Sequence, residues 1–187
     1  MPVVAKMTKL NADQIRKSHP NTAKKQINSI NRNPIVLVLD NVLDTYNIGS
    51  FFRLADAIGA LAIYICGPAV TPPNIKIHRS SIGTWKWIHW QHYQNTIDCI
   101  NNLKKQNYFI VSCELTKSSI LYNKAKYKTP LALVAGNESI GINPEVLKSS
   151  DLIVKIPMHG INKSLNTLTA TSIIAYQVLS AIHNTIN

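Results

Sequence analysis

The amino-acid sequence predicts an α/β domain with a mostly parallel sheet flanked by helices. From residue 34 onward, apolar runs typical of strands alternate with helical patterns, and this alternation is typical of parallel sheets. The clearest run is continuous rather than alternating, as expected for a strand that helices cover on both faces. With 187 residues, 45% apolar and 16% charged, the chain has the length and composition of one globular domain.

The predicted elements follow one another in a regular order. Largely apolar runs predict strands at residues 35–39, 61–66, 108–113, 131–135 and 152–156. Helical patterns predict helices at residues 47–58, 96–106, 144–149 and 165–182. Residues 69–93 are predicted to be rich in loops, and one or two short amphipathic helices fit residues 1–33.

Positive charge is concentrated at the beginning of the chain. The net charge is +11, and residues 1–33 hold seven Lys or Arg against one acid, Asp13. Because Pro34 marks a boundary, we expect a basic N-terminal extension at 1–33 and a main domain at 34–187. Such an excess favours a polyanionic partner such as a nucleic acid, since each contacted phosphate releases counterions. A solvated tail that only aids solubility is the alternative.

Several function classes are disfavoured by what the sequence lacks. Cys66, Cys99 and Cys113 are scattered, with no Cys or His cluster at metal-ligand spacing, so no metal site is expected. The chain has neither a G-x-G-x-x-G nucleotide fingerprint nor a phosphate loop. It also shows no signal peptide and no apolar run of membrane-spanning length, so we expect a cytoplasmic protein that does not enter membranes.

A first candidate segment follows the first predicted strand, where ligands collect in open α/β sheets. Arg53 lies six residues after Asn47 on one predicted helix, and its planar guanidinium is suited to clamping a phosphate. Alternatively, Arg53 pairs with Asp56 on a solvated face, and Asn47 is a helix N-cap.

Two further segments follow later strands. Gly136 and Gly141 bracket Asn137, Glu138 and Ser139, and glycines let a backbone approach a ligand closely. An ordinary strand-to-helix turn is the alternative there. In the third segment a Pro/Gly loop leads to Ser164 and Asn166 at the start of the long C-terminal helix, where either residue could cap the helix.

Taken together, the three segments resemble the signature motifs of the TrmH/SpoU family of SPOUT RNA ribose 2′-O-methyltransferases, in the same order, across roughly residues 35–183. The first resembles N-x-G-x-x-x-R, with Asn47, Gly49 and Arg53. The second resembles G-N/S-E-x-x-G, with Gly136, Asn137, Glu138 and Gly141. The third resembles I-P-M-x-G-x-x-x-S-L-N, with Ile156, Pro157, Met158, Gly160, Ser164, Leu165 and Asn166. One departure follows, because Leu168 stands where the family usually has a serine.

The resemblance implies a fold, a cofactor and partners. The fold would carry a C-terminal trefoil knot and form a homodimer whose sites use both chains. S-adenosyl-L-methionine would contact Gly136, Ile156 and Leu165, with Leu133 and Met158 nearby. The reaction would transfer a methyl group to a ribose 2′-hydroxyl of tRNA or rRNA. An RNA-binding or assembly factor with the same fold and little turnover is the alternative, although Arg53, Glu138 and Asn166 are all present.

The resemblance also implies roles for the site residues. Arg53 would act as the base or position the adjacent phosphate, and positioning is physically easier because a guanidinium has a pKa above about 12. Asn47 and Asn166 would orient the Arg or the ribose, Glu138 would fix the local network, and Ser164 would anchor the loop or the substrate. Between residues 78 and 90, Arg79 and Lys86 are candidates for phosphate contacts. The three Trp there fit either base stacking or, the interpretation we favour, the core or a dimer interface.

Overall fold

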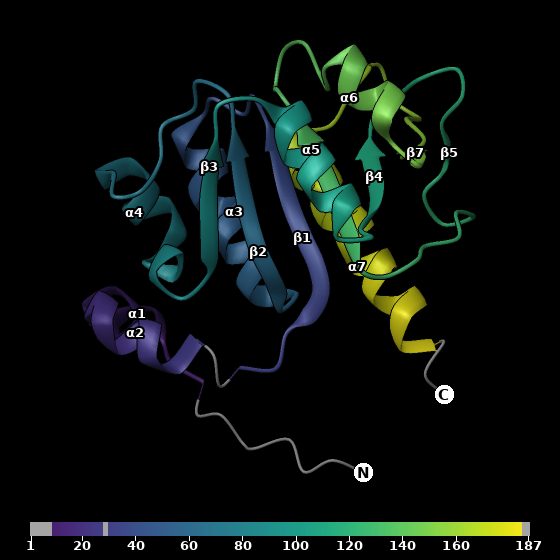
Figure 1. Cartoon of the computed structure of the whole chain (residues 1–187). Coiled ribbons are helices and arrows are strands. Elements are labelled where there is room, and N and C mark those ends of the chain that lie inside the picture. Colours follow the sequence, from purple (N-terminus) through teal and green to yellow (C-terminus); the bar gives the residue numbers. More distant parts are fainter. Residues whose placement is uncertain (1–8, 28–29, 185–187) are drawn as a thin grey trace.

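The computed structural model describes residues 9–27 and 30–184 of the chain. Its strands form one seven-stranded parallel sheet in the order β3-β2-β1-β6-β4-β7-β5 (Figure 1). The strands are β1 (Asn33–Asp40), β2 (Ala60–Cys66), β3 (His89–Tyr93), β4 (Phe109–Cys113), β5 (Ile120–Leu121), β6 (Leu131–Gly136) and β7 (Leu152–Lys155). The helices are α1 (Ala12–Lys17), α2 (Pro20–Ile27), α3 (Thr45–Ala57), α4 (Ile75–Ser81), the 3-10 turn η1 (Thr84–Lys86), α5 (Thr96–Lys105), α6 (Pro144–Ser149) and α7 (Thr167–Asn184).

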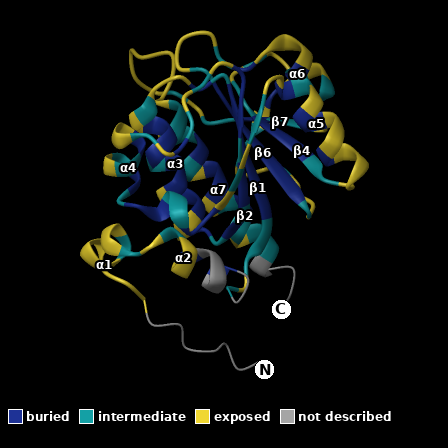
Figure 2. Ribbon diagram, turned by 60° about the vertical axis from the view of Figure 1, so that its left-hand side comes forward, coloured by how far each residue is buried: buried dark blue, intermediate teal, exposed yellow. Residues whose placement is uncertain are grey.

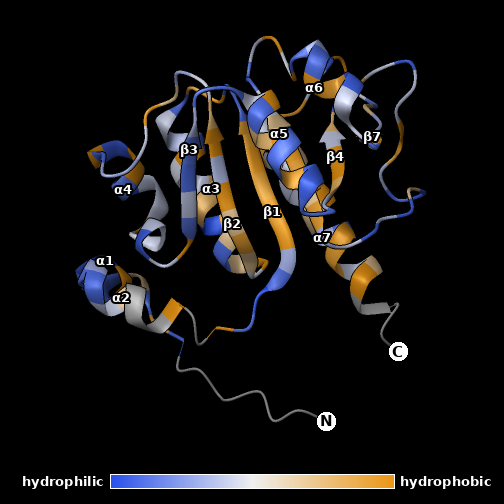
Figure 3. Cartoon of the chain, viewed as in Figure 1, coloured by the Kyte–Doolittle hydropathy of each residue, from blue (hydrophilic) through white to orange (hydrophobic). Residues whose placement is uncertain are grey.

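Two central strands explain the continuous apolar runs. β1 and β6 pair in register, with Leu37 beside Leu133 and Asp40 beside Gly136. Both faces of this pair are covered, so nearly every residue of the two strands is buried (Figure 2). Figure 3 shows β1 as a hydrophobic strand at the centre of the molecule. The predicted α/β architecture with a parallel sheet is therefore confirmed.

Helices cover the sheet on both faces. One core contains Leu37 and Leu133 with Phe51 and Phe52 of α3 and Ile174 of α7. The other core contains alternate residues of the same strands, packed on α5 and α6. This alternation follows from the pleat, because successive strand side chains point to opposite faces. The protein is thus a three-layer α/β/α structure.

The region 69–93, predicted to be loop-rich, contains α4, η1 and β3 instead. β3 was missed because it is a polar edge strand, His-Trp-Gln-His-Tyr, with no apolar run. α4 was missed because it is short; Asn74 caps its N-terminus, and its C-cap is Ile82, whose φ is 56°. β5 has only two residues, too few for a periodic signal.

The described part of the N-terminal segment packs against the main domain. The Lys86 Nζ donates to the backbone carbonyls of Arg16 and Ser18 at 2.9 and 2.8 Å. The Trp87 indole N–H donates to the Ser18 hydroxyl at 3.1 Å. Gly83 has a φ of +86°, and a Cβ on it would lie 3.0 Å from the carbonyl of Ile15. We call the residues Arg16, Ser18, His78, Lys86 and Trp87 the α1–η1 corner. The domain boundary at residue 33 stays a prediction.

Candidate functional site

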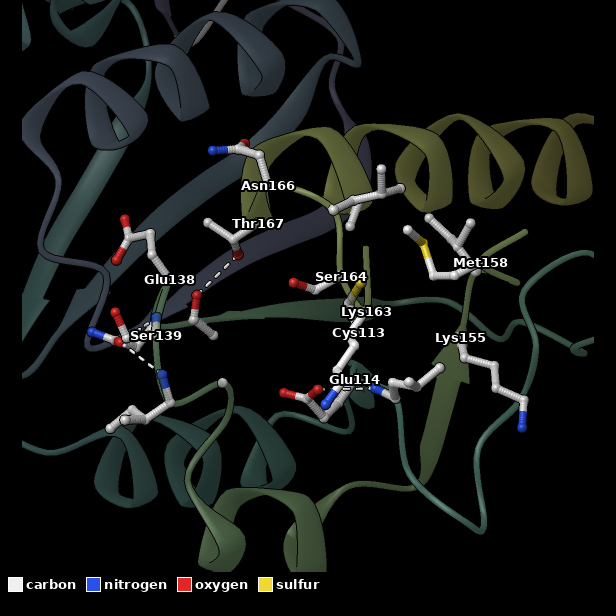
Figure 4. A pocket seen from close by; sticks show the side chains of 18 of the residues that line it. Cys113, Glu114, Glu138, Ser139, Lys155, Met158, Lys163, Ser164, Asn166 and Thr167 are labelled. Carbon is white, nitrogen blue, oxygen red and sulfur yellow. Dashed lines mark hydrogen bonds between the residues drawn. The ribbon is translucent and has the colours of Figure 1, made fainter. Parts of the chain in front are cut away.

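A pocket opens beside the switch point of the sheet. From β1 the sheet continues through β2 to β3 on one side, and through β6, β4 and β7 to β5 on the other. Ligands of open α/β sheets bind at such a point, at the carboxyl ends of the strands. Here the pocket has a volume of about 500 Å³ and is walled by the loops after β4, β6 and β7 and by the start of α7 (Figure 4). All three motif-bearing loops or helices meet at or next to it.

Hydrogen bonds join the three motif segments. The Glu138 carboxylate accepts from the Asn47 side-chain amide at 2.9 Å, and from the backbone N–H groups of Asp44 and Leu43 at 3.3 and 3.4 Å. The Asn47 Oδ1 accepts from the Asn166 side-chain amide at 3.3 Å. Asn47 is thereby held at both ends of its amide and is almost fully buried. The result is a fixed chain of side chains from Glu138 through Asn47 to Asn166.

The helix-cap interpretations divide between the two asparagines. Asp44, not Asn47, caps α3, because its carboxylate accepts from the Tyr46 N–H at 2.8 Å. That alternative for Asn47 is therefore wrong, and its amide is free to meet Glu138. Asn166 does cap α7, since its Oδ1 accepts from the Thr169 N–H at 3.2 Å. The Asn166 amide thus caps α7 with its oxygen and donates to Asn47 with its nitrogen.

Glycines bring backbone close to backbone at the pocket. A Cβ on Gly136 would lie 2.5 Å from the carbonyl carbon of Gly141 and 2.6 Å from the nitrogen of Ile142, so no other residue fits. The Asn137 Oδ1 accepts from the N–H groups of Ser139 and Ile140 at 2.9 and 3.1 Å. Thr167 donates its hydroxyl to the Gly136 carbonyl at 2.9 Å, as marked in Figure 4. The loop after β6 is therefore held in one shape.

The residues expected to bind the cofactor fall in two places. Gly136, Ile156, Met158 and Leu165 line the pocket, and so does Ser164. Leu133 lies in the middle of β6, fully buried in the core, and is not part of the pocket wall.

Arg53 stands apart from the pocket. It lies on α3, its side chain is exposed, and it does not line the cavity. Among the described residues we find no hydrogen bond or ion pair for its guanidinium. Burial raises the pKa of Asp56, and the cation that opposes this shift is Arg32 rather than Arg53. The alternative pairing of Arg53 with Asp56 is therefore not formed.

Sequence reasoning missed several polar groups at this edge of the sheet. Glu114 follows β4 and lines the pocket with Lys155 and Lys163. Burial, with a contribution from the Glu114 charge, raises the pKa of Cys113 to about 12, so this thiol is not a ready nucleophile. A carboxylate placed directly after an apolar strand was the available signal for Glu114.

Asp40, another missed residue, ends β1 and ties the layers together. It is fully buried and accepts hydrogen bonds from the Thr96 hydroxyl at 2.6 Å, the Asn143 N–H at 2.7 Å and the Asn41 amide at 2.8 Å. These partners stand at the N-terminal ends of α5 and α6 and in the loop after β1. Because its acceptors are used internally, Asp40 fixes the switch point rather than facing a ligand.

The Trp-rich segment belongs largely to the fold. Trp87 is buried, and Trp85 and Trp90 are partly buried against the main core. The Trp85 indole N–H donates to His78 Nδ1 at 3.2 Å. The interpretation that favoured packing over base stacking is supported. Lys86 is occupied by the carbonyls of the α1–η1 corner, whereas Arg79 is exposed.

Two further observations bear on the class of site. In residues 9–27 and 30–184, no cluster of three or more His, Cys, Asp or Glu side chains is arranged to hold a metal ion. No helix in the same ranges combines the length and the apolar character needed to cross a membrane.

Comparison with known proteins gives consistent matches. The model of the SpoU rRNA Methylase family matches residues 34–176. The chain is 31% identical over 144 residues to the tRNA (guanosine(18)-2′-O)-methyltransferase of Aquifex aeolicus, covering 76% of this chain and 67% of that one. It is 32% identical to the 23S rRNA (guanosine-2′-O-)-methyltransferase RlmB of Blochmanniella floridana, covering 78% and 57% of the two chains.

Solved structures agree with the sequence relatives. The A. aeolicus TrmH/SpoU tRNA modifying enzyme superposes with a TM-score of 0.77 at 27% identity, covering 88% of this chain and 86% of that one. An AdoMet-bound rRNA methyltransferase from Sinorhizobium meliloti superposes with a TM-score of 0.75 at 28% identity, covering 89% and 59%. The chain thus spans somewhat more than half of the length of several longer relatives.

Proposed function

Because the chain belongs to the SpoU rRNA methylase family, we propose that it transfers a methyl group from S-adenosyl-L-methionine to a ribose 2′-hydroxyl of tRNA or rRNA. The observation that carries the proposal is the hydrogen-bonded chain Glu138–Asn47–Asn166 at the pocket. It assembles polar groups from segments separated by 91 and 119 residues in the sequence. The curated relatives described above are named as methyltransferases, which favours turnover over a purely RNA-binding role.

The pocket fits this cofactor in size and chemistry. Its volume of about 500 Å³ lies in the range of small-molecule sites. Gly136 and Gly141 line the pocket with backbone, and Ile156, Met158 and Leu165 offer apolar surface for an adenine. When bound, the cofactor supplies a methyl group on a positively charged sulfur, and the sulfur is the leaving group.

The protein's own task is then to place and activate the acceptor. The ribose oxygen must stand about 3 Å from the methyl carbon and in line with the bond that breaks. Asn166 lies at the pocket, and its amide is fixed by Asn47 and by the Thr169 N–H, so it can orient a ribose without moving. Glu138 holds Asn47 and so acts as a positioning residue. Ser164 lines the same wall and can anchor the loop or the substrate.

Arg53 completes the site from a second copy of the chain. Its exposed guanidinium does not line the pocket of its own chain, which supports a homodimer in which it reaches the partner's pocket. An exposed face of α7 carrying Thr169, Ile173 and Tyr176, with Leu165 just before the helix, offers apolar surface for such a dimer. In this position Arg53 binds the phosphate next to the acceptor ribose, because a guanidinium stays protonated.

Three further features belong to the proposed function: a knot, a surface that binds RNA, and a cellular location. The segment that returns from β7 to α7 forms the trefoil knot. Basic residues outside the pocket, including Arg16 and Arg79, contact RNA phosphates and account for part of the net charge of +11. The protein works in the cytoplasm, where its RNA substrates are found.

The test is transfer of label to RNA. The wild-type protein is incubated with S-adenosylmethionine labelled in the methyl group and with total RNA that lacks this modification, and the labelled nucleotide is mapped. We expect label at one nucleotide position of a tRNA or rRNA, and strongly reduced label with Asn166→Ala. A protein that binds the cofactor but labels no RNA would contradict the proposal.

A further inference from the structure

One carboxylate of the pocket has no place in the motifs. Glu114 is half-buried directly after β4, and its side chain lines the pocket. Its Oε1 accepts from the Leu115 N–H and its Oε2 from the Ile142 N–H, each at 2.9 Å. Gly141 makes room for it, because a Cβ on that residue would clash with Oε2. The backbone on two sides thus holds this carboxylate in place.

Among the side chains that the structure describes, none neutralises the charge of Glu114. Within residues 9–27 and 30–184 the one ion pair closer than 4.0 Å joins Lys17 to Asp13, so neither Lys155 nor Lys163 pairs with Glu114. A carboxylate can accept about four hydrogen bonds, and the described part of the chain supplies two to Glu114. A half-buried anion with spare acceptor capacity at the end of a central strand is suited to meeting a donor group of a ligand.

The second carboxylate of the pocket differs in this respect. Glu138 already accepts from the Asn47 amide and two backbone N–H groups. In Figure 4 Glu138 lies on the side of Asn166 and Thr167. Glu114 lies below Cys113, away from Glu138. The two carboxylates therefore face different parts of a bound molecule.

We propose that Glu114 is a cofactor-binding residue that accepts hydrogen bonds from the ribose hydroxyls of the cofactor's adenosine. This inference rests on the proposed function, since it assigns a contact within the same pocket. The two hydroxyls of a ribose are adjacent donors that match the two oxygens of one carboxylate. An acidic side chain near a strand end meets a ribose in the same way in dinucleotide-binding sheets. Gly136 and Gly141 line the same pocket, so backbone rather than a large side chain stands beside Glu114.

The test is a double-mutant cycle between the residue and the ligand. Calorimetry measures wild-type, Glu114→Gln and Glu114→Ala proteins with S-adenosylhomocysteine and with its analogue in which both ribose hydroxyls are replaced by hydrogen. We expect each change alone, in the protein or in the ligand, to weaken binding about tenfold or more, as for hydrogen bonds to a charged group. The two changes together should weaken binding little further. Glu145→Gln, an exposed carboxylate on α6, is the matched control.

Each other outcome overturns the inference in a recognisable way. If Glu114→Gln weakens the binding of both ligands by the same factor, the residue only shapes the loop at Ile142. Unchanged affinity in both Glu114 variants means that it does not meet the ligand. Absence of any binding by the wild-type protein would contradict the proposed function as well, and so differs from failure of this inference alone.

Discussion

The pocket and the α1–η1 corner are both assembled from distant parts of the chain by hydrogen bonds, but they present different groups to a ligand. At the pocket, Glu138, Asn47, Asn137 and Asn166 are each fixed by hydrogen bonds to backbone or to one another. At the corner, hydrogen bonds from Lys86 and Trp87 hold α1, while the side chain of Arg16 on that helix is exposed.

The difference indicates two kinds of recognition. Fixed polar groups in a pocket suit one small ligand in one orientation, because no side chain has to be ordered when it binds. Exposed cations suit a polyanion bound in many registers, with an affinity that salt reduces. We therefore expect cofactor binding and RNA binding to respond independently to mutation, and a variant that changes both would break that separation.

The largest expected effect is on turnover. Arg53→Ala should lower methyl transfer about 100-fold or more while leaving cofactor affinity unchanged, because the guanidinium lies outside the pocket of its own chain. Single-turnover rates and calorimetry measure the two quantities on the same preparation. A collapse of cofactor affinity in this variant would contradict the assignment.

Mixed dimers test whether Arg53 acts in the pocket of the partner chain. When inactive Arg53→Ala and Asn166→Ala chains are unfolded and refolded together, mixed dimers should regain about a quarter of the wild-type rate. About half of the dimers are mixed, and each of them has one complete site of two. Arg53 acting within its own chain would leave the mixture inactive.

Gly136→Ala should damage the pocket directly. The added Cβ would lie 2.5 Å from the Gly141 backbone, so the loop must shift, at a cost of about 1–3 kcal/mol in the free energy of unfolding. Cofactor affinity should fall with it. Gly160→Ala is the matched control, because nothing lies within 4 Å of its Cβ position. Equal behaviour of the two variants would show that Gly136 is not required for close approach.

Arg16→Gln should affect only RNA. Arg16 is exposed on α1, and removing one phosphate contact should weaken RNA binding about fivefold and lower the slope of log K against log salt by about 1. Lys104→Gln on α5, which covers the other face of the sheet from α3 and α4, carries the same charge change as a control. If the two variants have the same slope, the corner has no special role in binding RNA.

Lys86→Met should have the smallest effect. It removes two hydrogen bonds to carbonyls of α1 and Ser18 that are partly exposed, so unfolding by urea should show a loss of about 1 kcal/mol. Cofactor affinity should stay unchanged. A large loss of cofactor affinity would show that the corner and the pocket are coupled.

The sequence predicted an element correctly where the periodicity of its apolar residues is a local signal. The strand at 35–39 and the helix at 47–58 were predicted because burial on both faces and a helical stripe are local signals, and they correspond to β1 and α3. The edge strand β3 is polar and carries no such signal. It is a strand because it pairs with β2, and that pairing is not visible in the local sequence. Partners such as Asn47 with Glu138, 91 residues apart, depend on the topology of the sheet.

The candidate site shows the same limit. Glycines and amides at 136–141 indicated a loop near a ligand, and Gly136, Ile156, Met158 and Leu165 do line the pocket. Glu114 and Asp40 were missed, since a single acid after a strand has no distinctive spacing. Leu133 was expected near the cofactor from its motif, but its strand side chain packs into the core.

The most direct test of the central claim is the chemical position of the transferred methyl group. After reaction of the wild-type protein with labelled cofactor and unmodified RNA, the RNA is hydrolysed in alkali, which cleaves only next to a free 2′-hydroxyl. A ribose 2′-O-methyltransferase places the label in an alkali-resistant dinucleotide. Label recovered in single nucleotides would locate the methyl group on a base and would contradict the account.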